Sequence, residues 1–482
     1  MKNGEGFMAK INEKYANRTK KPNKVLMFGE GNFLRAFIGR IVKNCNDVCA
    51  YNGGIVALQG VERGMSEVIN AQDGLYTLVE RGYENGGAVC RETVMDCLNG
   101  CINPYEDYEA FLATAREERI RVVISNTTEF GICYDQSETS LRPHKNFPAK
   151  LTDWLNERFR TLGEKGGVLI LPCELIDHNA DRLSEYVLRY AREWGLSEEF
   201  FVWLKEKCRF CNTLVDRVVS GYPSSEAKEM EKKFGYEDSL IDVCEPFLLW
   251  VIDSAAPIDE YIPVSKCGLN IVVTTNFESY RTRKVRILNG AHTGSVLAGH
   301  LCGFETVDQL VADPVFFSFI DGAMKEEVIP SFQGEHLHEY AEEVFERFRN
   351  PFIHHRLTSI ALNSVSKFRA RVLSSISDCV KKGIYPRRLF FSLAALLVFY
   401  EREADGAVND EAIYTERFKK YFDEGKTIGR REMLRKILSD EVLWGEDLTK
   451  ISGLYEQVAA DDERIGRLGM YKAVAEAARG QK

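Results

Sequence analysis

The chain has 482 residues, of which 45% are hydrophobic and 28% are charged, and its formal net charge is −9. These values are ordinary for a globular protein and exclude a disordered or fibrous chain. At roughly 150 residues per domain, the length indicates two or three domains. Proteins that bind nucleic acids usually carry a basic surface, whereas this chain is acidic overall, so we expect no nucleic-acid partner.

The most apolar stretch of the chain, Leu389 to Tyr400, is twelve residues long. A helix needs about 20 apolar residues to span a bilayer, so this stretch is predicted to be a buried core helix and no membrane partner is expected. The polar N-terminus lacks the apolar stretch of a signal peptide, which indicates a cytoplasmic protein. Nothing at the termini suggests an assembly motif, so we expect a monomer or a weak homo-oligomer.

Four short apolar runs in the first half are typical of strands buried on both faces of a parallel sheet. They cover residues 24–28, 54–58, 121–125 and 167–171, and helical patterns such as 108–115 lie between them. This alternation predicts a doubly wound α/β domain. The last convincing strand is 269–275, and helical patterns dominate from residue 283. We therefore predict an α/β N-terminal Rossmann-type domain with a parallel-sheet core over 1–280. A mainly α-helical substrate and catalytic domain is expected over 281–482.

The thirteen cysteines are scattered along the chain, many of them inside apolar segments. In a reducing compartment they are expected to be free, buried, small hydrophobic residues. Cys208 and Cys211 form a single CxxC pair. A zinc site needs a second pair or suitably spaced histidines, and none follows, so no metal is expected.

The first motif with chemical content directly follows the first predicted strand. Phe28 ends that strand, and Gly29, Gly31, Asn32 and Phe33 follow it. A GxG turn between a strand and a helix brings the backbone close to a pyrophosphate, which the helix N-terminus then binds. Leu34 occupies the position of the third glycine of the usual fingerprint, so a plain turn remains an alternative.

The end of the second predicted strand favours neither NAD nor NADP strongly. NAD enzymes usually have an acidic residue there, which accepts hydrogen bonds from the adenosine ribose. This chain has the neutral Gln59 instead. Glu62 follows a few residues later and can reach the ribose, whereas Arg63 can meet a 2′-phosphate.

A second motif, KVRILNGAH, opens the helical half and contains Lys284, Asn289 and His292. Hydride transfer to a ketone builds an alkoxide, which a lysine of lowered pKa can protonate and an amide can stabilise. On a regular helix Asn289 and His292 share a face, and Lys284 lies about 80° around the axis from His292. The alternative is a basic helix start with a capping asparagine and a hydrogen-bonded histidine.

Several segments in a fixed order carry a family resemblance. They are FGEGNFLRAF (28–37), QDGLYTLVER (72–81), SNTTEFGI (125–132), LPCELIDHNAD (171–181), NTLVDRV (212–218), EPFLLW (245–250), KVRILNGAHT (284–293) and RFRNPFIHHRLTSIALNSVSKFRARV (347–372). With these segments the chain resembles the mannitol dehydrogenase family, the polyol-specific long-chain dehydrogenases and reductases. The matches run from residue 28 to residue 372, about three quarters of the chain.

The resemblance implies a Rossmann domain that binds NAD, a helical C-terminal domain and no metal. It implies that Lys284 is the general acid and base, and that Asn289 and His292 bind the reacting oxygen and neighbouring hydroxyls. Lys367 matches a substrate-side position. The cofactor-binding residues that we expect from the resemblance and the motifs together are Phe28, Gly29, Gly31, Asn32, Phe33, Gln59, Asn126, Thr127 and Thr128.

One segment departs from the mannitol type of the family, in which a Cys-Asp-Asn asparagine helps to polarise the carbonyl. This chain has Cys173-Glu174-Leu175, a form that resembles the uronate reductases. The resemblance thus implies NAD-dependent interconversion of D-tagaturonate and D-altronate in hexuronate breakdown. Glu174 can bind a sugar hydroxyl or act on Lys284, and its alternative is a carboxylate at a helix start.

A uronate substrate carries a carboxylate, which the fork of an arginine suits. His354, His355, Arg356, Lys367 and Arg371 follow one another within a short stretch. We expect some of them to hold the carboxylate, with Arg356 and Lys367 as first candidates. The alternative is a solvated basic face.

Three other functions stay open. Fructuronate or a polyol such as mannitol would keep the chemistry and change the substrate. A non-catalytic protein that senses NAD(H) belongs to another class, although the joint presence of Lys284, Asn289 and His292 counts against it. An enzyme whose lysine forms a Schiff base with its substrate is the last and weakest alternative.

Overall fold

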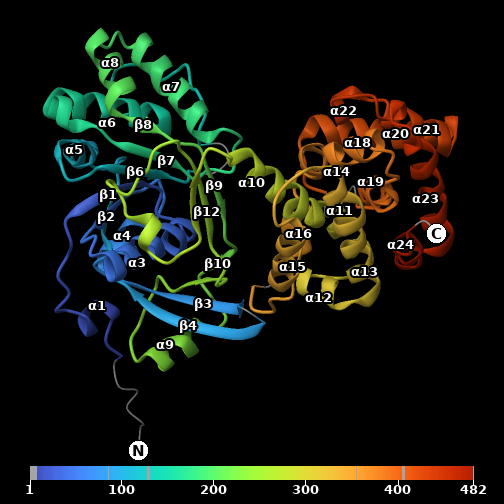
Figure 1. Ribbon diagram of the computed structural model, residues 1–482, viewed down its shortest axis with the longest axis horizontal. Helices are drawn as coiled ribbons and strands as arrows, with labels where there is room; N and C mark the ends of the chain where they lie inside the picture. The colour runs from blue at the N-terminus through green and yellow to red at the C-terminus, as the bar shows by residue number, and fades with distance from the viewer. Residues whose placement is uncertain are drawn as a thin grey trace, which may run out of the picture. The chain divides into compact units, whose positions relative to one another are not determined.

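The computed structural model describes residues 8–84, 86–127, 131–353, 355–403, 406 and 408–480. The chain divides into two compact units, Met1–Phe277 and Glu278–Lys482. In Figure 1 the first unit runs from blue to yellow-green and the second from there to red. Each unit is described here by itself.

The N-terminal unit is built on a six-stranded sheet in which every neighbouring pair is parallel. Its strand order is β5-β2-β1-β6-β7-β8, which confirms the predicted doubly wound domain. The strands are β1 (Asn23–Phe28), β2 (Gly54–Leu58), β5 (Leu98–Ile102), β6 (Val122–Ser125), β7 (Leu169–Pro172) and β8 (Arg209–Phe210). The order reverses between β1 and β6, where such sheets bind their ligands beyond the carboxyl ends of the strands.

Both faces of this sheet are covered, which explains why its strands are apolar throughout. On one face Leu26 and Val123 pack against Trp154 and Leu183 of the helical layer. This layer, at the top of Figure 1, consists of α5 (Tyr108–Ala113), α6 (Phe147–Leu162), α7 (Asn179–Glu193) and α8 (Glu198–Lys207). The opposite face packs against α3 (Arg40–Cys49) and β12 (Leu249–Asp253).

Two smaller sheets complete the unit, and the sequence predicted neither. One has the order β10-β11-β3-β4 and the other β13-β12-β9, and each contains antiparallel and parallel pairs. Their strands are β3 (Tyr76–Glu84), β4 (Gly87–Met95), β9 (Thr213–Asp216), β10 (Val219–Gly221), β11 (Asp242–Cys244) and β13 (Ile271–Thr274). The predicted strand 269–275 is therefore β13 of the three-stranded sheet. The hairpin β3-β4 projects at the bottom of Figure 1, and most of β4 is exposed, so it lacks an apolar run.

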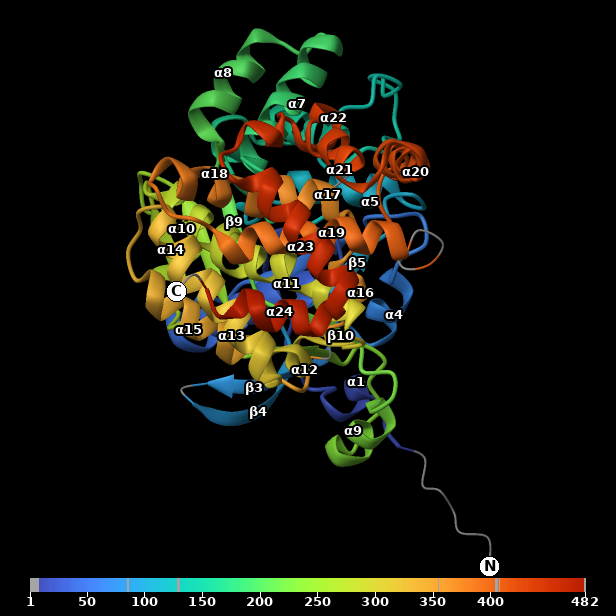
Figure 2. The ribbon, with the colours of Figure 1, turned by 90° about the vertical axis from the view of Figure 1, so that its right-hand side faces the viewer.

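The C-terminal unit is mainly helical, as predicted, and its described residues contain no strand. Its longer helices are α11 (Gly290–Leu301), α13 (Pro314–Gly322), α15 (Leu337–Phe348), α18 (Ser374–Lys381), α19 (Arg387–Arg402), α20 (Ala412–Ile428), α21 (Arg430–Leu438), α23 (Leu454–Leu468) and α24 (Met470–Ala478). Figure 2 views this unit face on, with α19, α23 and α24 in front of α11.

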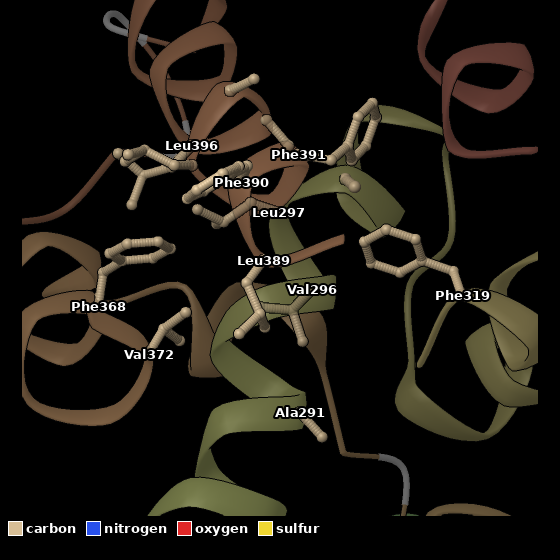
Figure 3. Packing of buried hydrophobic residues seen from close by; sticks show 14 of the residues in the cluster. Ala291, Val296, Leu297, Phe319, Phe368, Val372, Leu389, Phe390, Phe391 and Leu396 are labelled. Atoms are coloured by element: carbon tan, nitrogen blue, oxygen red, sulfur yellow. The ribbon is translucent and has the colours of Figure 1, made fainter. Parts of the chain in front are cut away.

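Helix α19 contains the most apolar stretch of the chain and forms the centre of the helical unit. All its residues from Arg388 to Tyr400 are buried, so the predicted core helix is confirmed. In Figure 3 its Leu389, Phe390 and Phe391 lie beside Val296 and Leu297 of α11. Of the helices in the described ranges, none is long and apolar enough to cross a membrane.

Several helices contain a wider π-helical stretch, which the sequence did not predict. Three such stretches adjoin residues of the predicted site: η1 (Arg35–Gly39), η5 (Lys284–Asn289) and η7 (Arg369–Leu373). In η1, Tyr76 donates a hydrogen bond to the carbonyl of Arg35 (2.7 Å). Because π-helical turns are rare and frequent at functional sites, these positions direct attention to both motifs.

Candidate active site

The turn after β1 has the geometry that a glycine-rich dinucleotide loop requires. Gly29 has a φ of 112°, a region that side chains rarely adopt, and a Cβ there would lie 3.0 Å from the carbonyl oxygen of Asn126. The same Cβ would lie 3.1 Å from Cδ1 of Leu34, which is buried in the place of the third glycine. Glycine at position 29 therefore allows the turn to approach β6.

The helix after the turn begins at Gly31, where a Cβ would meet no atom within 4 Å. The space in front of this helix start is thus open, as an approaching pyrophosphate needs. Arg35 holds the turn by donating to the carbonyl of Glu30 (2.8 Å) and to Oδ1 of Asn32 (2.6 Å). The ring of Phe33 stacks on Phe37, with centroids 5.1 Å apart.

The carboxyl ends of β6 and β7 are joined by Glu174, a buried residue. Its carboxylate accepts hydrogen bonds from the hydroxyl of Ser125 (3.0 Å) and from both the backbone N–H and the hydroxyl of Thr127 (2.9 Å each). Asn126 donates to the carbonyl of Cys173 (2.7 Å). Burial raises the pKa of Glu174, and the three hydrogen bonds oppose this rise. Glu174 therefore fixes the loop that carries two predicted cofactor residues.

Gln59, at the end of β2, is buried and uses its amide within its own loop. Its Nε2 donates to the carbonyls of Val61 (2.9 Å) and Glu62 (3.1 Å), and its Oε1 accepts from the N–H of Ser66 (3.0 Å). The side chain thus shapes the loop after β2.

The predicted cofactor residues meet at the carboxyl edge of the parallel sheet. A pocket of about 210 Å³ lies there, and its lining includes Phe28, Gly29, Gln59 and Thr127. Thr128 lies outside the described residues. The open helix start, the positive φ of Gly29 and this pocket together fit a dinucleotide that extends from the end of β1 to the end of β2.

In the helical unit, Lys284 begins η5 and is buried, and Asn289 ends the same segment and is half-buried. Because η5 is π-helical, the 80° expected between Lys284 and His292 on a regular helix does not apply. Gly290 follows, and a Cβ there would lie 3.4 Å from the carbonyl oxygen of Arg371. The backbone of η7 thus lies against the start of α11.

His292 is 8% exposed, and its Nε2 is buried without a hydrogen-bond partner among the described residues. The ring stacks on Phe348, with centroids 4.3 Å apart, and meets the ring of His355 edge-on at 5.0 Å. A buried ring nitrogen without a partner indicates a position that is completed by a ligand.

The surroundings of His292 are strongly cationic. Burial lowers the pKa of His292 well below its ordinary value, and His355 and the charges of Arg371, Arg347 and Lys367 lower it further. Burial also lowers the pKa of His355, to about 4, with contributions from Arg347 and Lys367. Both imidazoles are therefore neutral at physiological pH, and His292 Nε2 can donate to or accept from a sugar oxygen.

The basic residues predicted for the substrate separate in the structure. Lys367 is half-buried, donates to the carbonyl of Ile360 (3.0 Å) and acts on both histidines. Arg371 donates to the hydroxyl of Thr293 (3.4 Å), next to His292. Arg356 is exposed at the start of a short helix and is not among the charges that act on either histidine.

Sequence reasoning did not single out Arg347 as a site residue. It lies on α15 next to Phe348, which stacks on His292. The only sequence signal was its place at the start of the segment RFRNPF, far along the chain from His292.

Comparisons with known proteins agree over both units. The Mannitol dehydrogenase Rossmann domain matches residues 23–265, and the Mannitol dehydrogenase C-terminal domain matches residues 276–466. An altronate oxidoreductase from Escherichia coli O139:H28 is 40% identical over 466 residues, which cover 94% of this chain and 96% of the relative. The altronate oxidoreductase of Shigella flexneri serotype 5b matches with the same identity and coverage.

Two solved structures share the fold. The mannitol 2-dehydrogenase of Pseudomonas fluorescens, in a ternary complex with NAD and D-mannitol, has a TM-score of 0.73 at 19% identity and covers 96% of this chain and 95% of its own. A substrate-free D-sorbitol dehydrogenase has a TM-score of 0.77 at 22% identity, with 97% and 100% covered. The chain therefore belongs to the mannitol dehydrogenase family, whose members are oxidoreductases that act on CH–OH groups.

Proposed function

We propose that the protein interconverts D-tagaturonate and D-altronate with NAD(H), and that Lys284 is its general acid and base. The observation that carries the choice of a uronate is the cationic cluster around His292. Its positive charges come from Arg347, Lys367 and Arg371. A neutral polyol gains little from such a field, whereas a carboxylate forms charge-assisted hydrogen bonds with it. The 40% identity to altronate oxidoreductases supports the same choice.

The residues then have complementary tasks. When bound, the nicotinamide ring supplies or accepts the hydride. The ammonium of Lys284, buried in η5, gives a proton to the substrate oxygen during reduction and removes it during oxidation. The Asn289 amide donates to the oxygen on which negative charge develops. The neutral His292 binds an adjacent hydroxyl through Nε2.

The carboxylate of the substrate is assigned to Arg371 and Lys367, with Arg347 beside them. Arg371 provides the planar guanidinium that suits a carboxylate. It donates a hydrogen bond to Thr293, the residue that follows His292 in the sequence. Arg356, the other candidate from the sequence, is exposed and is expected to contribute less. Glu174 acts in this proposal by holding the Thr127 loop.

The first experiment offers D-tagaturonate, D-fructuronate and D-fructose in parallel to the purified protein and follows the loss of NADH absorbance. We expect fast loss with D-tagaturonate. Faster loss with D-fructuronate or D-fructose would move the substrate while keeping the mechanism. NADH binding without turnover on any of the three would contradict the proposal and favour an NAD(H) sensor.

The role of Lys284 predicts that Lys284→Ala lowers kcat by about 10² to 10⁴. NADH affinity should change less than about twofold, because the dinucleotide pocket is formed by residues of the other unit. Stopped-flow turnover and NADH fluorescence titration measure the two quantities separately. Near-normal turnover of the variant would rule out the assigned role.

The carboxylate assignment predicts that Arg371→Leu lowers kcat/KM for D-tagaturonate by a factor of about 10² or more, because a charge-assisted contact is lost. For D-fructose, which has no carboxylate, kcat/KM should fall by less than about fivefold. Arg371→Lys keeps the charge without the fork and should retain part of the selectivity. Arg356→Leu provides the comparison at the exposed position. Equal losses for both substrates in Arg371→Leu would contradict the assignment.

A further inference from the structure

The dinucleotide pocket contains a buried charge that the motifs did not indicate. The pocket lies at the carboxyl ends of β1 and β2, and Gly29, Gln59 and Gly60 form part of its wall. Its lining also includes Phe147 and Lys150 from the first turn of α6. In a doubly wound sheet the adenosine half of a dinucleotide lies at the end of the second strand, so this is the adenosine end of the site.

The acidic groups near this pocket are committed to the loop after β2. Glu30 accepts hydrogen bonds from the backbone N–H groups of Gly60 (3.0 Å) and Met65 (3.4 Å), one on each carboxylate oxygen. Gln59 is bound within the same loop. Among the described residues that line the pocket, none carries a carboxylate, whereas Lys145 and Lys150 carry ammonium groups.

Lys150 is 4% exposed, which is rare for a lysine. Its Nζ lies 3.9 Å from the ring centroid of Tyr105. Within the described part of the chain its ammonium makes no hydrogen bond and no ion pair within 4.0 Å. Burial lowers the pKa of Lys150 to about 8, against an upward contribution from Glu138.

Lys150 lines the pocket on an almost fully buried side chain, and an ammonium in such a place without a hydrogen-bonding partner is costly unless a ligand completes it. An adenosine ribose offers hydroxyl and ring oxygens that accept from an ammonium. We propose that Lys150 holds the adenosine ribose of the nicotinamide dinucleotide, in place of the carboxylate that other dinucleotide-binding domains have at the end of the second strand. The proposal rests on the proposed use of a dinucleotide but not on the identity of the sugar.

The test measures the binding of ADP-ribose, which contains the adenosine half without nicotinamide, by calorimetry, and of NADH by fluorescence. Lys150→Met preserves the length and apolar contacts of the side chain and removes a buried charge, so it is expected to fold. We expect Lys150→Met to weaken ADP-ribose and NADH by similar factors of about 10 to 100. Lys145→Met, at an exposed lysine that lines the same pocket, should change each affinity less than about threefold.

Unchanged ADP-ribose affinity in Lys150→Met would overturn the proposal, as would a loss for NADH without one for ADP-ribose. NADPH, measured in the same way, locates the contact on the ribose. A larger loss for NADPH than for NADH places the ammonium at the 2′ oxygen, and an equal loss places it at another ribose oxygen. Failure of NADH oxidation with D-tagaturonate would not affect these binding results, so the two proposals fail separately.

The pH dependence of ADP-ribose affinity provides a second test, which can be carried out on the wild-type protein alone. The titratable groups around the ammonium are Glu138, Tyr105, Lys145 and Cys133. Above a pKa of about 8, Lys150 loses its charge, so wild-type affinity for ADP-ribose should fall between pH 7 and pH 9.5. A flat profile in the wild type would contradict the proposal. Where Lys150→Met folds, its profile should be flat, which separates Lys150 from Lys145 and Cys133.

Discussion

Glu174 accepts three hydrogen bonds from Ser125 and Thr127 while being 2% exposed. From the sequence it was expected to contact the substrate, on the basis of its place in the Cys-Glu-Leu segment. The observed contacts add a task that spacing did not reveal, because Ser125 and Glu174 are distant in sequence and meet only where β6 and β7 pair. Residue types were therefore predictable from the motifs, whereas their partners across strands were not.

The contacts of Glu174 predict the effect of Glu174→Gln. An amide offers only one oxygen, and its NH₂ group would face the donors of Ser125 or Thr127. The free energy of unfolding should fall by about 1–3 kcal/mol, the cost of leaving buried donors unsatisfied. NADH affinity should also fall by about tenfold, because the loop moves.

Urea unfolding and NADH fluorescence titration measure these two changes. Glu185→Gln, an exposed position on α7, is the matched control and should leave both unchanged. A Glu174→Gln protein with unaltered stability and NADH affinity would show that Glu174 does not position the loop.

At the scale of elements, the π-helical segments are the feature that the sequence pattern could not predict. The helical periodicity around Lys284 correctly indicated a helix, but a single wider turn changes the direction of every side chain after it. Nothing in the apolar spacing distinguishes such a turn, because it depends on tertiary partners for the displaced carbonyls. In η1 these partners are Tyr76, at the carbonyl of Arg35, and Arg217, at the carbonyl of Ala36 (2.7 Å).

The two glycines of the first turn have different tasks, which leads to opposite predictions. Gly29 has a positive φ and no room for a Cβ, so Gly29→Ala should lower the free energy of unfolding by about 1–3 kcal/mol. Gly31 has an ordinary φ of −67° and open space, so Gly31→Ala should retain wild-type stability. The added methyl would nevertheless occupy space that a pyrophosphate needs.

We therefore expect Gly31→Ala to weaken NADH binding by about tenfold or more without a change in the urea midpoint. Both quantities are measured on the same preparation, with Gly466→Ala as a control for glycine replacement away from the pocket, at an exposed helical site where a Cβ meets no atom. Full NADH affinity in Gly31→Ala would place the pyrophosphate elsewhere.

At the scale of the whole molecule, the sequence predicted two classes of architecture and missed what surrounds them. The parallel strands were visible because burial on both faces makes them apolar throughout, and α19 was visible for the same reason. The mixed sheets escaped because β4 is mostly exposed and β10 and β11 are three residues each. The cationic cluster escaped in part because Arg347, Lys367 and His292 come from three separate helices.

The burial of His355 beside that cluster makes the stability of the molecule depend on pH. Burial lowers the pKa of His355 to about 4, and in the unfolded chain it returns to about 6.5. Below pH 6.5 the unfolded state therefore binds a proton that the folded state does not bind. The free energy of unfolding consequently falls as the pH falls, by about 1.4 kcal/mol per pH unit for this one group, until the pH reaches about 4.

Other buried groups act in the opposite direction, so the prediction concerns a difference between two proteins. Burial raises the pKa of Asp242 and of Glu327 to about 7, and both contribute stability that is lost as the pH rises toward that value. In His355→Gln these contributions remain and only that of His355 disappears. From pH 6.5 to pH 5, wild type should lose about 2 kcal/mol more than His355→Gln in urea unfolding. His338→Gln, an exposed histidine on α15, should follow wild type. If His355→Gln loses as much stability as wild type over this range, then burial and the neighbouring cations do not hold His355 neutral, and the electrostatic argument for a carboxylate site there loses this support.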